Sequence, residues 1–185
     1  NTGILSAELN YNFLNFEKFF IPEDCIGTEN DYGEFNAHHA SGRMSKYKDN
    51  KILFAIGEYR YRDHAQNESN VFGKLIAIDK DTKLYDLISM GHRNNQGLYY
   101  DSKNDTIFMT EHGPNGGDEI NINLNPNNII KNYGWPISSY GEHYGFNERD
   151  DNADKYIKAP LYKSHSDYGF IEPLDYFVPS IGISQ

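Results

Sequence analysis

The sequence predicts an all-β fold of the β-propeller type, of which this chain would hold about three blades. Short apolar runs bounded by Gly, Asn and Asp recur along the chain, as is typical of strands joined by tight turns. The aromatic residues are mainly Tyr (15) and Phe (11), which favour half-buried strands over helices. A unit built only from such strands returns after about 55 residues, the spacing expected of propeller blades.

The strands are predicted in chain order as follows. Ala7 to Phe20 has some helical character but no clear cap, so we expect loop and strand there. An apolar strand is predicted over residues 51–57, and residues 106–110 repeat its form. Residues 74–79 form another predicted strand, which is expected to pair with residues 83–89 across a short polar turn.

The repeat also relates polar positions. Gly42 and Gly97 lie about 55 positions apart, as do the apolar strands that follow them. On this register His39 and Asn94 occupy the same position, just ahead of a strand. In a propeller, such positions from successive blades converge around the central channel, so we expect these two side chains near one site.

We expect residues 1–185 to form one partial domain, because a propeller needs at least about four blades. Its predicted parts are a poorly defined N-terminal segment (1–34), two blades (35–90 and 91–140), and an insertion leading into the next blade (141–185). The alternative is a small complete β-domain. We favour the truncated piece of a larger propeller.

Composition excludes several classes of function. The net charge of −10 would repel a phosphate backbone, so no nucleic-acid partner is expected. No apolar run reaches the roughly 18 residues of a membrane helix. Cys25 is the only cysteine, which rules out an intrachain disulfide and a Cys-rich zinc site. No signal peptide is visible at the start of the chain.

Three polar, glycine-rich segments stand out, at residues 91–97, 111–119 and 132–136. They are separated by short apolar runs, so they are expected to lie in loops that connect strands. A rigid β-scaffold can aim loop side chains at a ligand, and glycine lets the backbone approach that ligand closely. The pattern predicts a binding or catalytic site built on these loops.

Each candidate side chain has a functional and a structural interpretation. His39 is suited to take a proton at neutral pH, or it is a loop-packing histidine. Arg93 offers a planar fork of donors for a carboxylate or a developing negative charge, or it forms a salt bridge. Asn94 and Gln96 either orient a ligand or tie down their loop.

Metal binding is a further possibility. Residues 113–119 combine carboxylates with a Gly-Pro pair whose carbonyl groups suit calcium, although a tight turn explains the same residues. Seven histidines raise a zinc or iron hydrolase as another hypothesis, but they are scattered along the chain. Trp135 is expected to serve as a packing wedge.

Four motifs in this order carry a family resemblance. They are His39-x-Ser41-Gly42-Arg43, the Gly-His-Arg-Asn-x-Gln-Gly segment at 91–97, the segment at 111–119, and Asn-Tyr-Gly-Trp-Pro at 132–136. Together they resemble the soluble sugar dehydrogenases that use pyrroloquinoline quinone, the glucose/sorbosone dehydrogenase family. The resemblance covers roughly residues 35 to 185.

The resemblance implies a six-bladed propeller that oxidises an aldose at C1 and passes hydride to the quinone. It implies that His39 is the base that takes the proton of the anomeric hydroxyl. Arg93 and Asn94 would hold the cofactor and stabilise negative charge on its oxygen, and Gln96 and His112 complete the implied cofactor-binding set. The implied partners are a sugar substrate and an electron acceptor, and the implied location is periplasmic or secreted.

Calcium is also implied, at two different places in different members of the family. Gly113 and Pro114 match carbonyl ligands in some members. Glu119 and the backbone of Tyr133 match a calcium site in others. The sequence departs from the family at Asn95, where Pro is usual, and in a longer link at residues 122–131.

Further cofactor contacts in the family come from blades outside this stretch, so the chain by itself is expected to be inactive. The alternative function is a non-catalytic propeller that binds a protein or a glycan, because binding modules share the fold. Lost catalysis would predict a damaged His39 or Arg93, and both residues are intact. We therefore favour the enzyme.

Overall fold

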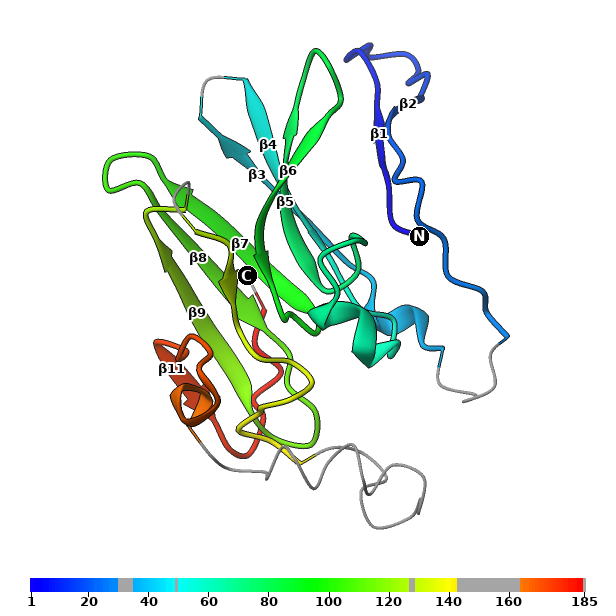
Figure 1. Ribbon diagram of the computed structural model, residues 1–185. Coiled ribbons are helices and arrows are strands. Elements are labelled where there is room, and N and C mark those ends of the chain that lie inside the picture. Colours follow the sequence, from blue (N-terminus) through cyan, green and yellow to red (C-terminus); the bar gives the residue numbers. More distant parts are fainter. Residues whose placement is uncertain (30–34, 49, 127–128, 143–163, 185) are drawn as a thin grey trace.

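The protein is built from two stacked β-sheets and a separate β-hairpin (Figure 1). The computed structural model describes residues 1–29, 35–48, 50–126, 129–142 and 164–184. Within these residues the only helices are three short 3₁₀ turns. The elements are β1 (Ile4–Ser6), β2 (Glu17–Phe20), η1 (Ala37–His39), β3 (Ser41–Tyr47), β4 (Lys51–Ile56), η2 (Arg62–Gln66), β5 (Lys74–Asp79), β6 (Tyr85–Met90), β7 (Asn95–Asp101), β8 (Thr106–Glu111), β9 (Asp118–Leu124), β10 (Lys131–Asn132), η3 (His165–Tyr168) and β11 (Asp175–Phe177).

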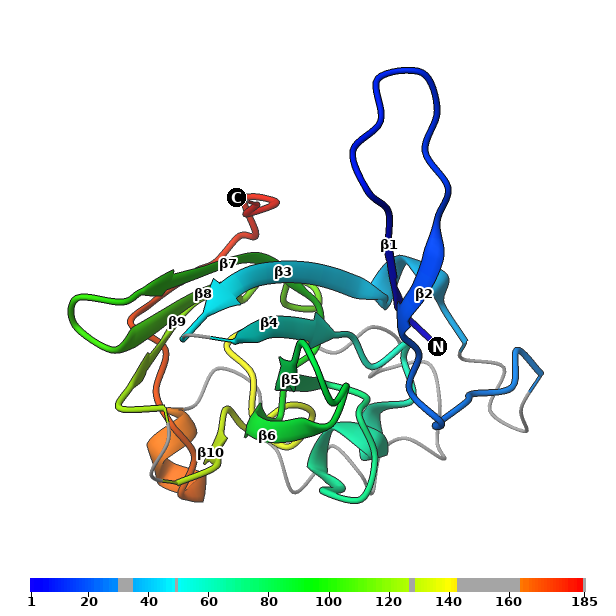
Figure 2. The same ribbon diagram turned by 90° about the horizontal axis from the view of Figure 1, so that it is seen from above.

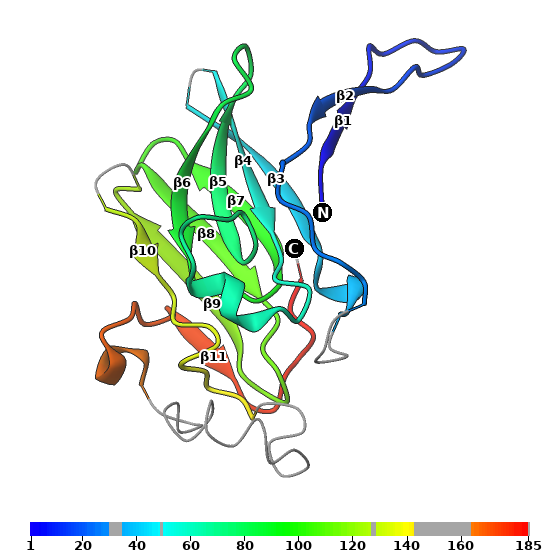
Figure 3. The same cartoon turned by 45° about the vertical axis from the view of Figure 1, so that its right-hand side comes forward.

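Both sheets follow a simple up-and-down order. The first sheet runs β10-β6-β5-β4-β3, with β3 to β6 antiparallel and the short β10 parallel to β6. The second runs β11-β9-β8-β7 and is antiparallel throughout. Neither sheet closes on itself. The 3₁₀ turn η2 lies at the end of the first sheet, between β4 and β5 (Figure 3).

The core consists of two layers, one on each face of the first sheet. Leu53 and Ala55 of β4 face the second sheet and pack with Ile107 and Met109 of β8. Phe54 and its neighbours on the opposite face pack against the β1–β2 hairpin, whose tip extends away from the sheets (Figure 2). Side chains alternate between faces along a strand, so a strand buried on both faces reads as a continuous apolar run. This double burial explains the unbroken hydrophobicity of residues 52–56.

The structure confirms the strand predictions. The apolar runs at 51–57, 74–79 and 106–110 form β4, β5 and β8, and β6 pairs with β5 as expected. The segment predicted as loop and strand ends in β2. Of the predicted insertion at 141–185, residues 143–163 lie outside the described residues. None of the helices in the described part of the chain is long and apolar enough to span a membrane.

The predicted repeat is wrong by one residue for the polar positions just before β3 and β7. The N–H of Gly57, just after β4, donates to the carbonyl of Ala40. The N–H of His112, just after β8, donates in the same way to the carbonyl of Asn94. Asn94 is therefore the counterpart of Ala40, and the counterpart of His39 is Arg93. The cause is the β7–β8 turn, which is one residue longer than the β3–β4 turn.

Candidate active site

The three predicted polar loops meet at one end of the two sheets. His39 belongs to η1 just before β3, Arg93 lies in the loop before β7, and His112 follows β8. Because β3 and β7 are neighbours across the two sheets, residues far apart in the sequence come together here. An open pocket at this end is lined by His39, Arg60, Arg93, Asn94, Gln96 and Pro114, among others.

His39 is held between a carboxylate and a guanidinium. Its Nδ1 lies 2.6 Å from Oε1 of Glu58, which is fully buried. Its Nε2 lies 3.2 Å from Nη2 of Arg93. A carboxylate accepts the Nδ1 proton, and an arginine can only donate, so the neutral ring carries its proton on Nδ1. The lone pair on Nε2 then faces Arg93 beside the pocket.

The surroundings of His39 favour this neutral form. Burial lowers the pKa of His39 from its ordinary value of 6.5, and the positive charge of Arg93 lowers it further. The hydrogen bond to Glu58 raises the pKa but does not offset burial. A neutral imidazole at physiological pH is the form that accepts a proton. The arrangement can therefore act as a general base.

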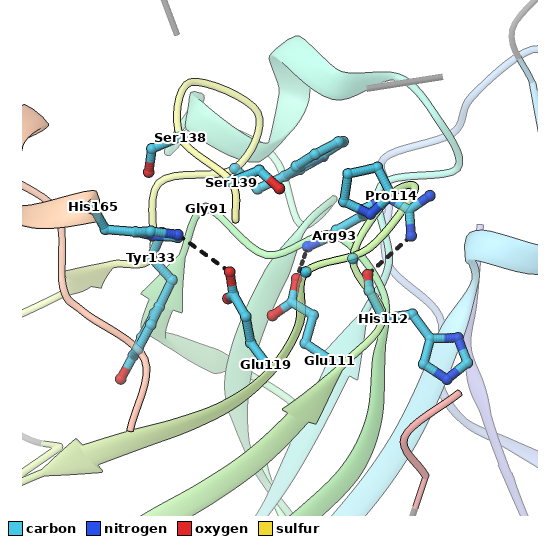
Figure 4. Close-up of a pocket in the computed structure, with 13 residues that line it drawn as sticks. Gly91, Arg93, Glu111, His112, Pro114, Glu119, Tyr133, Ser138, Ser139 and His165 are labelled. Carbon is cyan, nitrogen blue, oxygen red and sulfur yellow. Dashed lines mark hydrogen bonds and ion pairs between the residues drawn. The ribbon is translucent and has the colours of Figure 1, made fainter. Parts of the chain in front are cut away.

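Arg93 is fixed by contacts on several sides. Its Nη1 donates to the carbonyl of His112 at 2.9 Å, and its backbone N–H donates to the carboxylate of Glu111 (Figure 4). Its guanidinium carbon lies 5.3 Å from the ring centre of Trp135. The same Glu111 carboxylate accepts from Nδ1 of His92 at 3.0 Å. A guanidinium held this firmly is preorganised for an anionic group in the pocket.

The amide of Asn94 ties η1 and β3 to β7. Its Oδ1 accepts from the backbone N–H and hydroxyl of Ser41 and from Nε2 of Gln96, and its Nδ2 donates to the carbonyl of His38. Asn94 is 4% exposed, whereas Gln96 is half-buried. These contacts give Asn94 the loop-tying role that the sequence left open, while both side chains still line the pocket.

A C-terminal segment forms another wall of the pocket. Oδ2 of Asp118 accepts backbone N–H groups of Ile181, Gly182 and Ile183, and its Oδ1 accepts from Gly113. Nε2 of His112 lies 2.6 Å from the carbonyl of Ile183. Burial would raise the pKa of Asp118, but the backbone donors bring it below its ordinary value. Asp118 thus clamps residues 181–183 beside the site.

The family resemblance implies two calcium positions, and the residues at only one of them suit a calcium ion. Among the described residues no backbone N–H donates to the carbonyl oxygens of Gly113 and Pro114, so these oxygens are available as ligands. At the other position, Nε2 of His165 lies 3.2 Å from Glu119 and Nδ1 lies 2.9 Å from the carbonyl of Tyr133. The implied ligands Glu119 and Tyr133 are therefore engaged by a side chain, and they do not fit a calcium ion.

The described part of the chain also contains no group of three or more His, Cys, Asp or Glu side chains that could hold a metal ion. The histidine-metal hypothesis therefore finds no ligand set there. His39, His92 and His165 each pair with a different buried glutamate instead. His143 lies outside the described residues.

Sequence reasoning missed several residues of this site. Glu58, Glu111, Asp118 and His165 all contact predicted site residues. Only Glu58 carried a usable signal, since it is the acidic residue directly after the apolar run 51–57. Glu111 and Asp118 were part of a noted motif but had no individual role. His165 is brought to Glu119 only by tertiary packing.

Fold and site together define an all-β protein with a buried histidine held between a glutamate and an arginine beside an open pocket. The chain belongs to the glucose/sorbosone dehydrogenase family, whose model matches residues 28–185. It is 30% identical over 196 residues to the aldose sugar dehydrogenase YliI of Escherichia coli, covering 98% of this chain and 46% of that protein. It is also 30% identical over 141 residues to quinoprotein glucose dehydrogenase B of Acinetobacter calcoaceticus, covering 58% of this chain and 28% of that protein.

The structural comparison agrees with this membership. The apo crystal structure of the soluble aldose sugar dehydrogenase from Escherichia coli superposes with a TM-score of 0.72 at 25% identity. The match covers 98% of this chain and 51% of that structure. This chain therefore spans about half the length of that structure and less than half of the two relatives above.

Proposed function

We propose that this chain is part of a sugar dehydrogenase that oxidises an aldose at C1 and delivers hydride to pyrroloquinoline quinone. Membership of the glucose/sorbosone dehydrogenase family supports the sugar substrate, and the quinoprotein among the relatives supports the quinone. We take the two stacked sheets as neighbouring blades of a propeller. The observation that carries the proposal is the buried Glu58–His39–Arg93 arrangement at the open pocket.

The residues around the pocket suit an anionic quinone. Arg93 and Arg60 place two guanidinium groups at its wall, and His112 and Gln96 add hydrogen-bonding groups. Guanidinium forks match carboxylate groups in geometry and charge. When bound, the quinone supplies the hydride acceptor. The carbonyls of Gly113 and Pro114 line the same pocket and are the proposed ligands for a calcium ion there.

His39 performs the proton transfer in this proposal. Its Nε2 takes the proton of the C1 hydroxyl as the C1–H bond breaks and its electron pair leaves as hydride. The sugar becomes a lactone, and His39 becomes an imidazolium. Glu58 holds the ring through Nδ1 and stabilises the imidazolium that forms. General-base catalysis of this kind typically contributes about 10²–10⁴-fold to the rate.

Arg93 has two effects in the proposed reaction. Its guanidinium keeps His39 unprotonated before the reaction, because a second positive charge nearby is unfavourable. It also places positive charge at the wall of the pocket, where it would stabilise negative charge on a bound quinone. Preorganised charge stabilisation of this type is commonly worth about 3–4 kcal/mol. The electron acceptor that reoxidises the cofactor and a periplasmic or secreted location remain parts of this proposal.

The test uses the complete gene product loaded with calcium and pyrroloquinoline quinone. Sugar-dependent reduction of a redox dye should be present in wild type and fall by about 10²-fold or more in His39→Ala. His64→Ala is the matched control, because His64 packs against Tyr61 and Phe72 away from the pocket. Quinone binding without any sugar-dependent dye reduction in wild type would contradict the proposal and favour a non-catalytic binding module.

A further inference from the structure

His165 occupies a position between two oxygen atoms from different parts of the chain. Figure 4 shows its ring pointing from η3 toward the carboxylate of Glu119 on β9. Nε2 lies 3.2 Å from Oε1 of Glu119, and Nδ1 lies 2.9 Å from the carbonyl oxygen of Tyr133. All three residues are buried, with His165 only 1% exposed. The ring therefore joins β9, the turn after β10 and η3.

The ring of His165 faces the two oxygen atoms that the family resemblance implies as calcium ligands. A backbone carbonyl only accepts a hydrogen bond, and an ionised carboxylate also only accepts. Nδ1 of His165 donates to the Tyr133 carbonyl, while Nε2 lies within ion-pair distance of Oε1 of Glu119, whose Oε2 accepts from Asn121. A buried carboxylate needs a partner of opposite charge or a shared proton, and His165 is placed to provide it.

The packing around His165 leaves no space for a hydrated ion. Tyr140 stacks on the ring at 5.0 Å between centroids with an interplanar angle of 17°. The hydroxyl of Tyr140 donates to Glu172, which also accepts from the backbone N–H of Ser166. The cavity beside Glu119 and His165 measures about 10 Å³, roughly the size of one water molecule. Calcium requires six to eight oxygen ligands, so it would have to displace the ring.

We propose that the ring of His165 occupies the position between Glu119 and the Tyr133 carbonyl, so that this position takes a side chain of the protein instead of calcium. The inference does not depend on the proposed sugar oxidation, because it concerns how η3 and β9 are held together. It predicts that Glu119 is not a calcium ligand in the native protein, whatever binds at Gly113 and Pro114. Removal of the ring would leave two unsatisfied oxygen ligands that a divalent cation can then use.

The test measures the melting temperature of the complete gene product after chelation and again with added CaCl₂. Any calcium-dependent rise in Tm should be equal in wild type and Glu119→Gln. His165→Ala should melt lower than wild type and gain an additional calcium-dependent rise, which the double variant His165→Ala/Glu119→Gln should lose. His64→Ala is the matched control, because it removes an imidazole from another part of the fold and should show only the wild-type response.

A second measurement covers the case in which His165→Ala does not fold. In the wild-type protein labelled with ¹⁵N-histidine, saturating CaCl₂ should leave the ring nitrogen chemical shifts of His165 unchanged. A calcium-induced change in these shifts would overturn the proposal. A calcium-dependent rise in the Tm of wild type that Glu119→Gln abolishes would overturn it as well.

Discussion

Nη2 of Arg93 lies 3.2 Å from Nε2 of His39, although His39 precedes β3 of the first sheet and Arg93 precedes β7 of the second. The nitrogen that would accept the substrate proton is thus the one that faces a permanent positive charge. Glu58 faces the opposite nitrogen at 2.6 Å. Glu58 therefore orients the His39 ring, and Arg93 helps to keep that ring unprotonated.

Removal of the Arg93 charge should raise the pKa of His39. Burial lowers this pKa below 6.5 in the native protein, and Arg93 adds to the effect. In Arg93→Gln we expect the pKa, followed by NMR of histidine-labelled protein without cofactor, to move upward. Arg60→Gln is the matched control and should cause a smaller shift, because Arg60 is the weakest of the contributing charges. A wild-type value above 6.5 would contradict this account.

The same shift has a consequence for stability. The pKa of His39 is lower in the folded protein than in the unfolded chain, so the unfolded chain binds more protons between the two values. The contribution of His39 to the free energy of unfolding is therefore complete above pH 6.5 and falls as the pH drops toward the lowered pKa. Chemical denaturation across this pH range should show that the difference in the free energy of unfolding between wild type and His39→Gln shrinks on acidification. A difference that widens on acidification would contradict this expectation.

Glu58 should act by positioning His39. In Glu58→Gln the side chain keeps its shape but loses the charge that stabilises the imidazolium, so kcat should fall by about 10²–10⁴-fold. KM for the sugar should change little, and the acid limb of the pH–rate profile should move, because Glu58 raises the pKa of His39. The exposed Glu68 provides the control variant Glu68→Gln. A loss confined to KM, with an unchanged pH profile, would contradict a positioning role.

The strands could be predicted because their apolar runs are long enough to show periodicity. Residues 52–56 form a continuous apolar run since β4 is buried on both faces, whereas in β8 the buried Ile107 and Met109 alternate with partly buried side chains. The exact register of the repeat could not be predicted, because one extra residue in a turn leaves no mark on hydrophobicity. For this reason the sequence repeat pairs His39 with Asn94, whereas the structure pairs it with Arg93.

The candidate site was only partly visible in the sequence. His39, Arg93 and His112 lie in glycine-rich or polar loops, where functional side chains are expected. The position of Glu58 after an apolar run is a signal for a site residue, but its partner His39 is set by the fold, and for His165 the sequence carries no signal at all. The separation between His165 and Glu119 gives no periodic or motif signal. A calcium ligand pair carried over from a family resemblance therefore turned out to be bound by an unforeseen histidine.

Asp118→Asn should loosen the C-terminal wall of the pocket. Asp118 accepts four backbone N–H groups, and an amide accepts them less strongly and only through its one oxygen, so we expect a loss of about 1–3 kcal/mol in the free energy of unfolding. The pKa of Asp118 is depressed, so its contribution is present above about pH 3.8 and is lost as the pH falls further.

Calorimetry of Asp118→Asn and wild type at neutral and acidic pH checks this expectation. The difference in stability should be full at pH 7 and shrink toward pH 3 (roughly one unit below the unperturbed pKa). The exposed Asp167 offers the control Asp167→Asn, which should behave as wild type at both pH values. A difference that stays constant with pH would show that the carboxylate charge is not what holds residues 181–183.

Lys74 provides a prediction for the opposite side of the pH scale. Its side chain is fully buried, and Nζ donates to the carbonyls of His64, Ala65 and Phe72 at 2.7, 3.1 and 2.7 Å. Burial lowers the pKa of Lys74 to about 8. Lys74→Met fits the same space but leaves three carbonyls without a donor, so we expect a loss of about 1–3 kcal/mol in the free energy of unfolding at pH 7.

The sign of the pH dependence follows from the lowered pKa. Between pH 8 and 10.5 the unfolded chain holds a proton on Lys74 that the folded protein has lost, so the wild-type free energy of unfolding should gain from this group as the pH rises. Urea denaturation at several pH values should therefore show the gap between wild type and Lys74→Met widening across this window. The exposed Lys103 supplies the control Lys103→Met, which should follow wild type throughout. Equal stability of Lys74→Met and wild type at pH 7 would contradict this account. The cost of burying the ammonium group would then equal the benefit of its three hydrogen bonds, and Lys74 would not hold the η2 loop against β5.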